Sequence, residues 1–106
     1  MKVVYVAGPY RAKTEHEVVI NIRKAEAVAI EVWKAGHVAL CPHKNTAFFG
    51  GICPDEVWLT GDLEFVRRCD AVILVPGYET SKGALAEIKE ARKVGIPIYE
   101  SVVDIE

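Results

Sequence analysis

Hydrophobic residues alternate along the chain between short continuous runs and longer stretches in which they recur every three or four positions. The continuous runs cover residues 2–7, 37–41, 71–75 and 96–100, and they are rich in β-branched residues that favour strands. Polar positions hardly interrupt the first and third runs, which is typical of strands buried on both faces of a sheet. The pattern therefore predicts four strands.

The periodic stretches lie between these runs and predict three amphipathic helices. The first covers residues 15–35, the second begins at Pro54 with an acidic first turn, and the third covers residues 81–94. Glycine follows the first and the third directly, as expected at helix C-termini.

Strict alternation of strands and helices implies a parallel sheet with right-handed crossovers and helices on both faces. The expected fold is an α/β three-layer sandwich with four or five parallel strands, formed by one domain over residues 1–106. Residues 101–106 could supply the fifth strand or form a flexible end. Ligands bind such sheets at the carboxyl ends of the strands, where the strand order reverses. With the first strand central, the loops that begin at Gly8, Pro42 and Pro76 would converge on one crevice.

Composition narrows the possible partners of this domain. The chain has 106 residues, 51% of them hydrophobic, and a formal net charge of −2. This size supports a core but is small for a complete enzyme cleft, so we expect a homodimer or a higher homo-oligomer. Basic residues form no block, so a nucleic acid polymer is not an expected partner. No signal peptide and no apolar run near the roughly 18 residues that cross a bilayer is present, so we expect a cytoplasmic protein without membrane contact.

Residues 80–87 carry the most informative chemistry. A strand that ends in a loop with Ser81 and Gly83 and then enters a helix presents free N–H groups and the positive end of the helix dipole, which suit a phosphate. Glu87 follows at the spacing Ser-x-Gly-x-x-x-Glu, so its carboxylate could face the same crevice. Alternatively, Ser81 is only a helix N-cap and Glu87 is a solvated charge.

The loop of residues 8–13, after the first predicted strand, is a second candidate for ligand binding. Gly8 allows a sharp turn and a close approach to a ligand, and Pro9 ends strand pairing and fixes the exit direction of the chain. Arg11 could meet a phosphate above the edge of the sheet. A solvated loop without a ligand is an equal alternative.

The long loop of residues 42–54 contributes polar side chains to the same edge, and long loops in compact domains are usually functional or mobile. We expect His43 and Asn45 to contact the substrate, with a loop-anchoring hydrogen bond as the alternative role of His43. Zinc binding by Cys41, His43 and Cys53 is disfavoured, because the paired spacing of structural zinc ligands is missing. We therefore expect no metal and no other cofactor. The odd number of cysteines, three, also argues against a disulfide framework.

Three motifs follow one another along the chain: Tyr5-Val6-Ala7-Gly8-Pro9, then Gly61-Asp62-Leu63 with Arg68-Cys69-Asp70-Ala71, and finally Ser81-x-Gly83-x-x-x-Glu87. Over nearly the whole length, the chain resembles the nucleoside 2-deoxyribosyltransferase-like superfamily. Residues 76–84 are similar to a branch of small domains known as DUF4406. The resemblance implies a flavodoxin-like, Rossmann-like fold and N-glycosidic chemistry on deoxynucleosides or deoxynucleotides.

The resemblance also implies roles for individual residues. Glu87 matches the nucleophile of the superfamily, Asp62 an aspartate near the base or the leaving group, and Tyr5 an active-site tyrosine. Arg11 and Ser81 match phosphate-contacting positions of its deoxynucleoside-monophosphate hydrolases. Those hydrolases carry a serine where this chain has Pro9, so the preference for a monophosphate stays open.

These residue types suit the chemistry on physical grounds as well. An oxocarbenium-like transition state calls for a carboxylate against the anomeric carbon and a proton donor near the departing base. Glu87 would form a glycosyl-enzyme intermediate, and Asp62 would protonate or hydrogen-bond the base. Water as acceptor makes a hydrolase, and a second base makes a transferase. Two other hypotheses are a nucleotide-binding module without catalysis and a structural or partner-binding domain.

Overall fold

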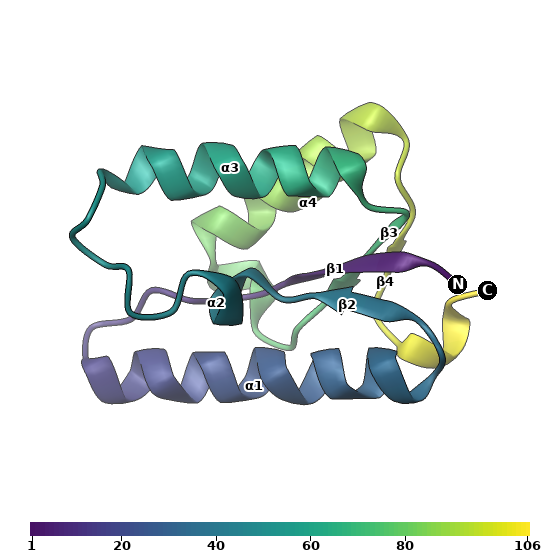
Figure 1. The fold of residues 1–106 in the computed structure, drawn as a ribbon, viewed down its shortest axis with the longest axis horizontal. Helices are drawn as coiled ribbons and strands as arrows, with labels where there is room; N and C mark the ends of the chain where they lie inside the picture. Colours follow the sequence, from purple (N-terminus) through teal and green to yellow (C-terminus); the bar gives the residue numbers. More distant parts are fainter.

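A four-stranded parallel sheet lies between two layers of helices in the computed structural model, which describes residues 1–106 (Figure 1). The strands are β1 (Val3–Ala7), β2 (Val38–Leu40), β3 (Ala71–Leu74) and β4 (Ile98–Tyr99). Their order in the sheet is β2-β1-β3-β4, so β1 is an inner strand and the order reverses between β1 and β3. The predicted flavodoxin-like α/β sandwich is confirmed, with four strands.

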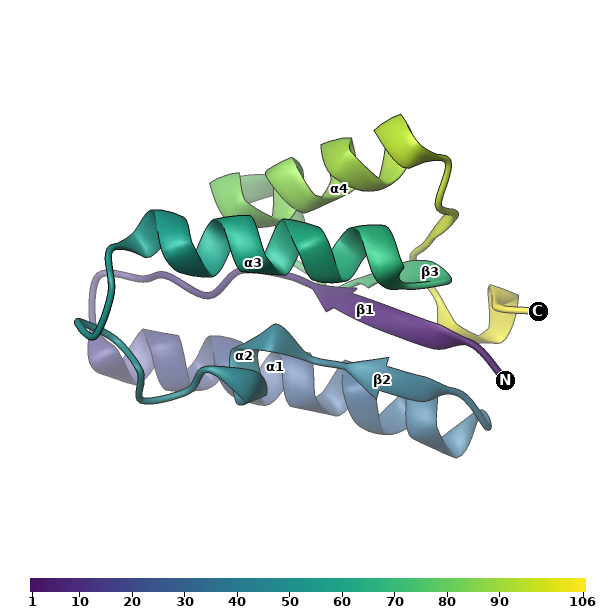
Figure 2. The same cartoon turned by 45° about the horizontal axis from the view of Figure 1, so that its top comes forward.

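The helices divide between the two faces of this sheet. The long helix α1 (Glu15–Lys34) covers one face, and α3 (Asp55–Arg68) and α4 (Lys82–Val94) lie side by side over the other (Figures 1 and 2). All three occupy the stretches where helical periodicity predicts them.

Side chains of β1 show how the sheet divides the core. Successive side chains of a strand point to opposite faces, so Val4 and Val6 face α1 while Tyr5 and Ala7 face α3 and α4. The apolar cluster on the α1 face consists of Val4, Val6, Ala25, Ala29, Val32, Ala71, Ile73, Val75 and Ile105. The cluster on the other face consists of Tyr5, Ala7, Val66, Cys69, Val72, Leu74, Ile88 and Ala91. The alternation thus directs the phenol of Tyr5 toward α4.

Three segments differ from the prediction. The loop after β2 begins with a short helix, α2 (Pro42–Asn45), because Pro42 suits the first position of a helix. The last strand is shorter than expected, since only Ile98 and Tyr99 pair with β3. The prediction of an added strand or a flexible end for residues 101–106 was wrong. This segment forms the 3-10 turn η2 (Val102–Asp104), and Ile105 packs into the core beneath α1.

Several features bear on the classes of function considered above. None of the helices combines the length and the apolar character that crossing a membrane requires. The chain contains no group of three or more histidine, cysteine, aspartate or glutamate side chains that could hold a metal ion. All three cysteines are free.

Candidate active site

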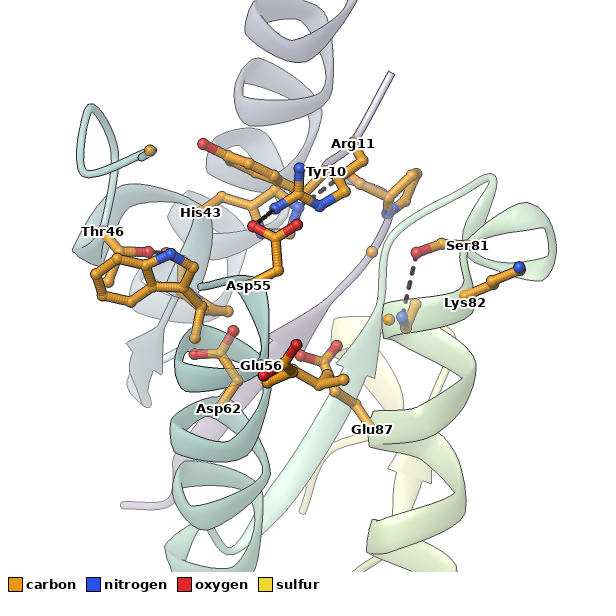
Figure 3. A pocket seen from close by; sticks show the side chains of 18 of the residues that line it. Tyr10, Arg11, His43, Thr46, Asp55, Glu56, Asp62, Ser81, Lys82 and Glu87 are labelled. Carbon is orange, nitrogen blue, oxygen red and sulfur yellow. Dashed lines mark hydrogen bonds and ion pairs between the residues drawn. The ribbon is translucent and has the colours of Figure 1, made fainter. Parts of the chain in front are cut away.

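A cavity of about 630 Å³ opens at the carboxyl edge of the sheet, beside the point where the strand order reverses (Figure 3). The loops that follow β1, β2 and β3 meet there, as the sequence predicts. They contribute Gly8 and Pro9, Pro42 and His43, and Ser81, respectively. The N-terminal halves of α3 and α4 complete the wall, so that the cavity collects side chains from distant parts of the chain.

Glu87 is buried in the wall of this cavity, with only 6% of its surface exposed. It lies in the second turn of α4, directly above the face of β1 that carries Tyr5. The fully buried Tyr5 hydroxyl donates a hydrogen bond to Glu87 Oε2 and fixes the orientation of the carboxyl group. The alternative interpretation of Glu87 as a solvated helix charge was wrong.

Burial controls the ionisation of this pair. It raises the pKa of Glu87 to about 8, and the nearby charge of Asp62 adds to the effect, while the hydrogen bond from Tyr5 opposes it. Burial and the charges of Glu87 and Asp62 raise the pKa of Tyr5 far above its ordinary value. Tyr5 therefore stays protonated and donates, and Glu87 is largely a neutral acid near pH 7.

Asp62 faces the same cavity from α3. Figure 3 shows its carboxyl group and that of Glu87 turned toward the cavity from two different helices. Asp62 is half-buried rather than solvated, and burial raises its pKa to about 6. Two carboxyl groups with separated, elevated pKa values in one cavity are typical of sites for acid, base or nucleophilic chemistry.

The N-terminus of α4 forms the part of the wall predicted to bind an anion. Ser81 is the N-cap residue, and its hydroxyl accepts a hydrogen bond of 3.1 Å from the Ala84 N–H. The N–H groups of Lys82 and Gly83 bond to no other group of the chain. Ser81 is thus both a helix cap and a wall residue, and two free donors remain beside it.

Two glycines of the wall differ in what a side chain would meet at their positions. A Cβ atom at Gly8 would come within 2.5 Å of the Val75 Cβ, so packing of β1 against β3 requires a glycine there. A Cβ atom at Gly83 would meet only Ser81 Oγ, at 3.9 Å. Packing of the protein therefore does not explain Gly83, and the open space beside it belongs to the cavity.

His43 holds the first loop in place. Its Nε2–H donates a hydrogen bond of 2.8 Å to the carbonyl oxygen of Pro9, and Tyr10 packs edge-on against its ring at 5.3 Å between centroids. Burial lowers the pKa of His43 and so favours the neutral imidazole. This geometry matches the loop-anchoring alternative. Asn45 lies exposed at the end of α2 and does not line the cavity.

Arg11 lines the mouth of the cavity, but it already has a partner. Its guanidinium forms an ion pair with Asp55, the first residue of α3 (Figure 3). Sequence reasoning missed Asp55 and three neighbours on the same helix that also line the cavity: Glu56, Trp58 and Leu59. Helical spacing gave a usable signal for three of them, since Leu59, Trp58 and Asp55 lie three, four and seven positions before Asp62 and share its face of the helix.

Comparison with known proteins identifies the family of this chain. The profile of a family described as a domain of unknown function, DUF7768, matches residues 2–101. The chain belongs to the DUF7768 family. The more specific resemblance to a DUF4406 branch is not confirmed. No curated protein matches the sequence.

Among solved structures, this DUF7768 chain is similar to a 2-deoxyribosyltransferase from the psychrotolerant bacterium Bacillus psychrosaccharolyticus, which is described as a biocatalyst for nucleoside synthesis. The TM-score is 0.63 at 22% sequence identity, and the similarity covers 91% of this chain and 69% of the other. At this identity the similarity establishes a shared fold.

Proposed function

We propose that this DUF7768 protein cleaves or transfers the N-glycosidic bond of a deoxynucleoside or its 5′-monophosphate, with Glu87 as the nucleophile. One observation carries the proposal: a buried carboxyl group, oriented by the Tyr5 hydroxyl, opens on a cavity that a second carboxyl group, Asp62, also faces. Retaining cleavage of glycosidic bonds commonly uses two carboxyl groups in this way. The fold, shared with a 2-deoxyribosyltransferase, adds support.

In the proposed mechanism, a Glu87 carboxylate oxygen attacks the anomeric carbon, and the bond from that carbon to the base nitrogen breaks. The electron pair leaves with the base, which Asp62 protonates or stabilises by a hydrogen bond. Water or a second base then attacks the anomeric carbon and releases Glu87. Tyr5 acts as a positioning residue, because its hydroxyl holds the carboxylate and lowers the pKa of Glu87.

The test is incubation of the purified protein with deoxynucleosides and their 5′-monophosphates, with and without a second free base, followed by chromatography of the bases. We expect release or exchange of base by the wild type and none by Glu87→Gln. Glu90→Gln is the matched control, because Glu90 lies on the same helix and pairs with Arg67 outside the cavity. Equal base release by Glu87→Gln and the wild type would disprove the assignment.

A nucleotide-binding module without catalysis is the second candidate. It is favoured by the raised pKa of Glu87, because a neutral carboxyl group hydrogen-bonds a ligand well but is a poor nucleophile. This candidate predicts that a deoxynucleoside or its 5′-monophosphate raises the melting temperature of the protein without any product.

We also propose a homodimer or a larger homo-oligomer in the cytoplasm. Exposed apolar side chains between α2 and α3 support assembly, among them Phe48, which is 99% exposed, and Ile52, which is 76% exposed. Three free cysteines suit a reducing compartment. Light scattering of the purified protein tests assembly, and a monomeric mass at micromolar concentration would contradict it.

A further inference from the structure

The mouth of the cavity carries an ion pair that bears on which substrates can enter. Arg11, from the loop after β1, contacts Asp55 at the start of α3, and both side chains are 69% exposed (Figure 3). Glu56 follows Asp55 and also lines the cavity. An exposed pair of this kind contributes little to fold stability. Its main effect is on the charge that an incoming ligand meets.

That charge is negative. Besides Glu87, which is largely neutral near pH 7, the wall contains three acidic side chains and two basic ones: Asp55, Glu56 and Asp62, and Arg11 and Lys82. Asp55 pairs with the Arg11 guanidinium, whereas Lys82 forms no ion pair. A phosphate monoester carries between one and two negative charges near neutral pH, roughly as for a phosphorylated serine. To reach Arg11 it would have to displace Asp55 or lie beside two carboxylates.

Pro9 removes a further means of binding a phosphate. It lines the cavity and precedes Arg11 by two positions, but it has neither a hydroxyl group nor a backbone N–H to donate. Asp55 makes no capping hydrogen bond to its own helix, because the N-cap of α3 is Pro54 and no side chain caps this end. The one hydrogen bond and ion pair of the Asp55 side chain is the one with Arg11.

From this geometry we infer that Asp55 is a specificity-determining residue: by engaging Arg11 and placing a carboxylate at the mouth, it makes the site select unphosphorylated deoxynucleosides over their 5′-monophosphates. This assignment rests on the function proposed above, whose substrate class it narrows. The unphosphorylated 5′-hydroxyl would meet the mouth without charge repulsion.

The test compares two variants with a matched change in charge. Asp55→Asn removes the carboxylate that contacts Arg11, and Glu56→Gln removes a carboxylate of the same helical turn without an Arg11 contact. For each protein we measure kcat/KM and Kd with one deoxynucleoside and its 5′-monophosphate. The wild type should favour the nucleoside. In Asp55→Asn, the kcat/KM and the affinity for the monophosphate, each relative to the value for the nucleoside, should rise about tenfold, as expected for freeing one cation and removing one repulsive charge. Glu56→Gln should change the ratio less, and Arg11→Ala combined with Asp55→Asn should abolish most of the gain.

A wild-type preference for the monophosphate, an unchanged ratio in Asp55→Asn, or an equal gain in Glu56→Gln would overturn the inference. The ratio of the Kd values for the two compounds separates failure of the selectivity from failure of the proposed reaction, because binding does not require catalysis. Binding that follows the expected ratio without any base release supports the selectivity and disproves catalysis. Base release with a ratio that Asp55→Asn does not change supports catalysis and disproves the selectivity. A folded protein that binds neither compound disproves both.

Discussion

Replacing Glu87 by glutamine should stabilise the folded protein, and the gain should grow with pH. The pKa of Glu87 rises from an ordinary value of 4.5 to about 8 on folding, chiefly because the carboxyl group is buried. Between these two values the folded state holds a proton that the unfolded state has lost, so the stability of the wild type falls as pH rises. Above the folded pKa both states are ionised and the loss is constant. Glutamine keeps nearly the same shape without any ionisation.

The magnitude follows from the two pKa values. Each unit of pKa difference corresponds to about 1.4 kcal/mol. Ionisation of Glu87 therefore lowers the free energy of unfolding by about 1 kcal/mol near pH 5, about 3 kcal/mol near pH 7 and about 5 kcal/mol near pH 9. The Asp62 carboxyl group, whose pKa is also raised, is present in both proteins, so its contribution largely cancels in the difference between variant and wild type.

Urea unfolding of the wild type, Glu87→Gln and Glu90→Gln near those three pH values measures the effect. We expect Glu87→Gln to exceed the wild type by a margin that grows with pH, and Glu90→Gln to show no such growth. A difference in the free energy of unfolding between Glu87→Gln and the wild type that does not change with pH would refute this reasoning. So would a Glu87→Gln protein that is less stable than the wild type near pH 9, because ionisation of the buried Glu87 would then not destabilise the fold.

Further expectations follow from the same geometry. Gly8→Ala should lower the free energy of unfolding by about 1–3 kcal/mol in urea titrations, because its Cβ would meet Val75 at 2.5 Å. Gly83→Ala should leave stability unchanged or slightly higher but weaken binding of the deoxynucleoside in calorimetry, since only cavity space would receive its methyl group. The kcat/KM of the wild type should rise with pH up to about 8, as Glu87 becomes a carboxylate, and a fall over this range would contradict a Glu87 nucleophile. Tyr5→Phe should move this rise to higher pH, because the hydrogen bond that lowers the pKa of Glu87 is lost; an unmoved profile would contradict the positioning role.

Much of the fold was predictable because each element carries its own local signal. The uninterrupted apolar run of β1 and the helical periodicity of α1 reflect burial that these residues experience in the structure. Residues 101–106 were not predictable, because Ile105 is buried only through contacts with distant parts of the chain. No periodicity within six residues encodes such a contact.

The site was predictable in part, for a related reason. The convergence of the three loops follows from strand order, and the sequence motif marks Glu87. The burial of Glu87 and its hydrogen bond with Tyr5 depend on the packing of α4 against β1. The two residues lie 82 positions apart in the chain. The pairing of Arg11 with Asp55 is equally non-local, at 44 positions, and the sequence alone predicted either a phosphate contact or a solvated loop for Arg11.

The proposed mechanism depends on a covalent bond between Glu87 and the anomeric carbon of the sugar. A deoxynucleoside with fluorine at the sugar 2′ position tests it most directly, because the electronegative substituent destabilises the oxocarbenium-like transition state and lets a glycosyl-enzyme intermediate accumulate. Mass spectrometry of the quenched and digested protein should find the fluorinated sugar on the peptide that contains Glu87, and no adduct in Glu87→Gln. Base release by the wild type together with an adduct on another residue, or an adduct that persists in Glu87→Gln, would contradict the claim.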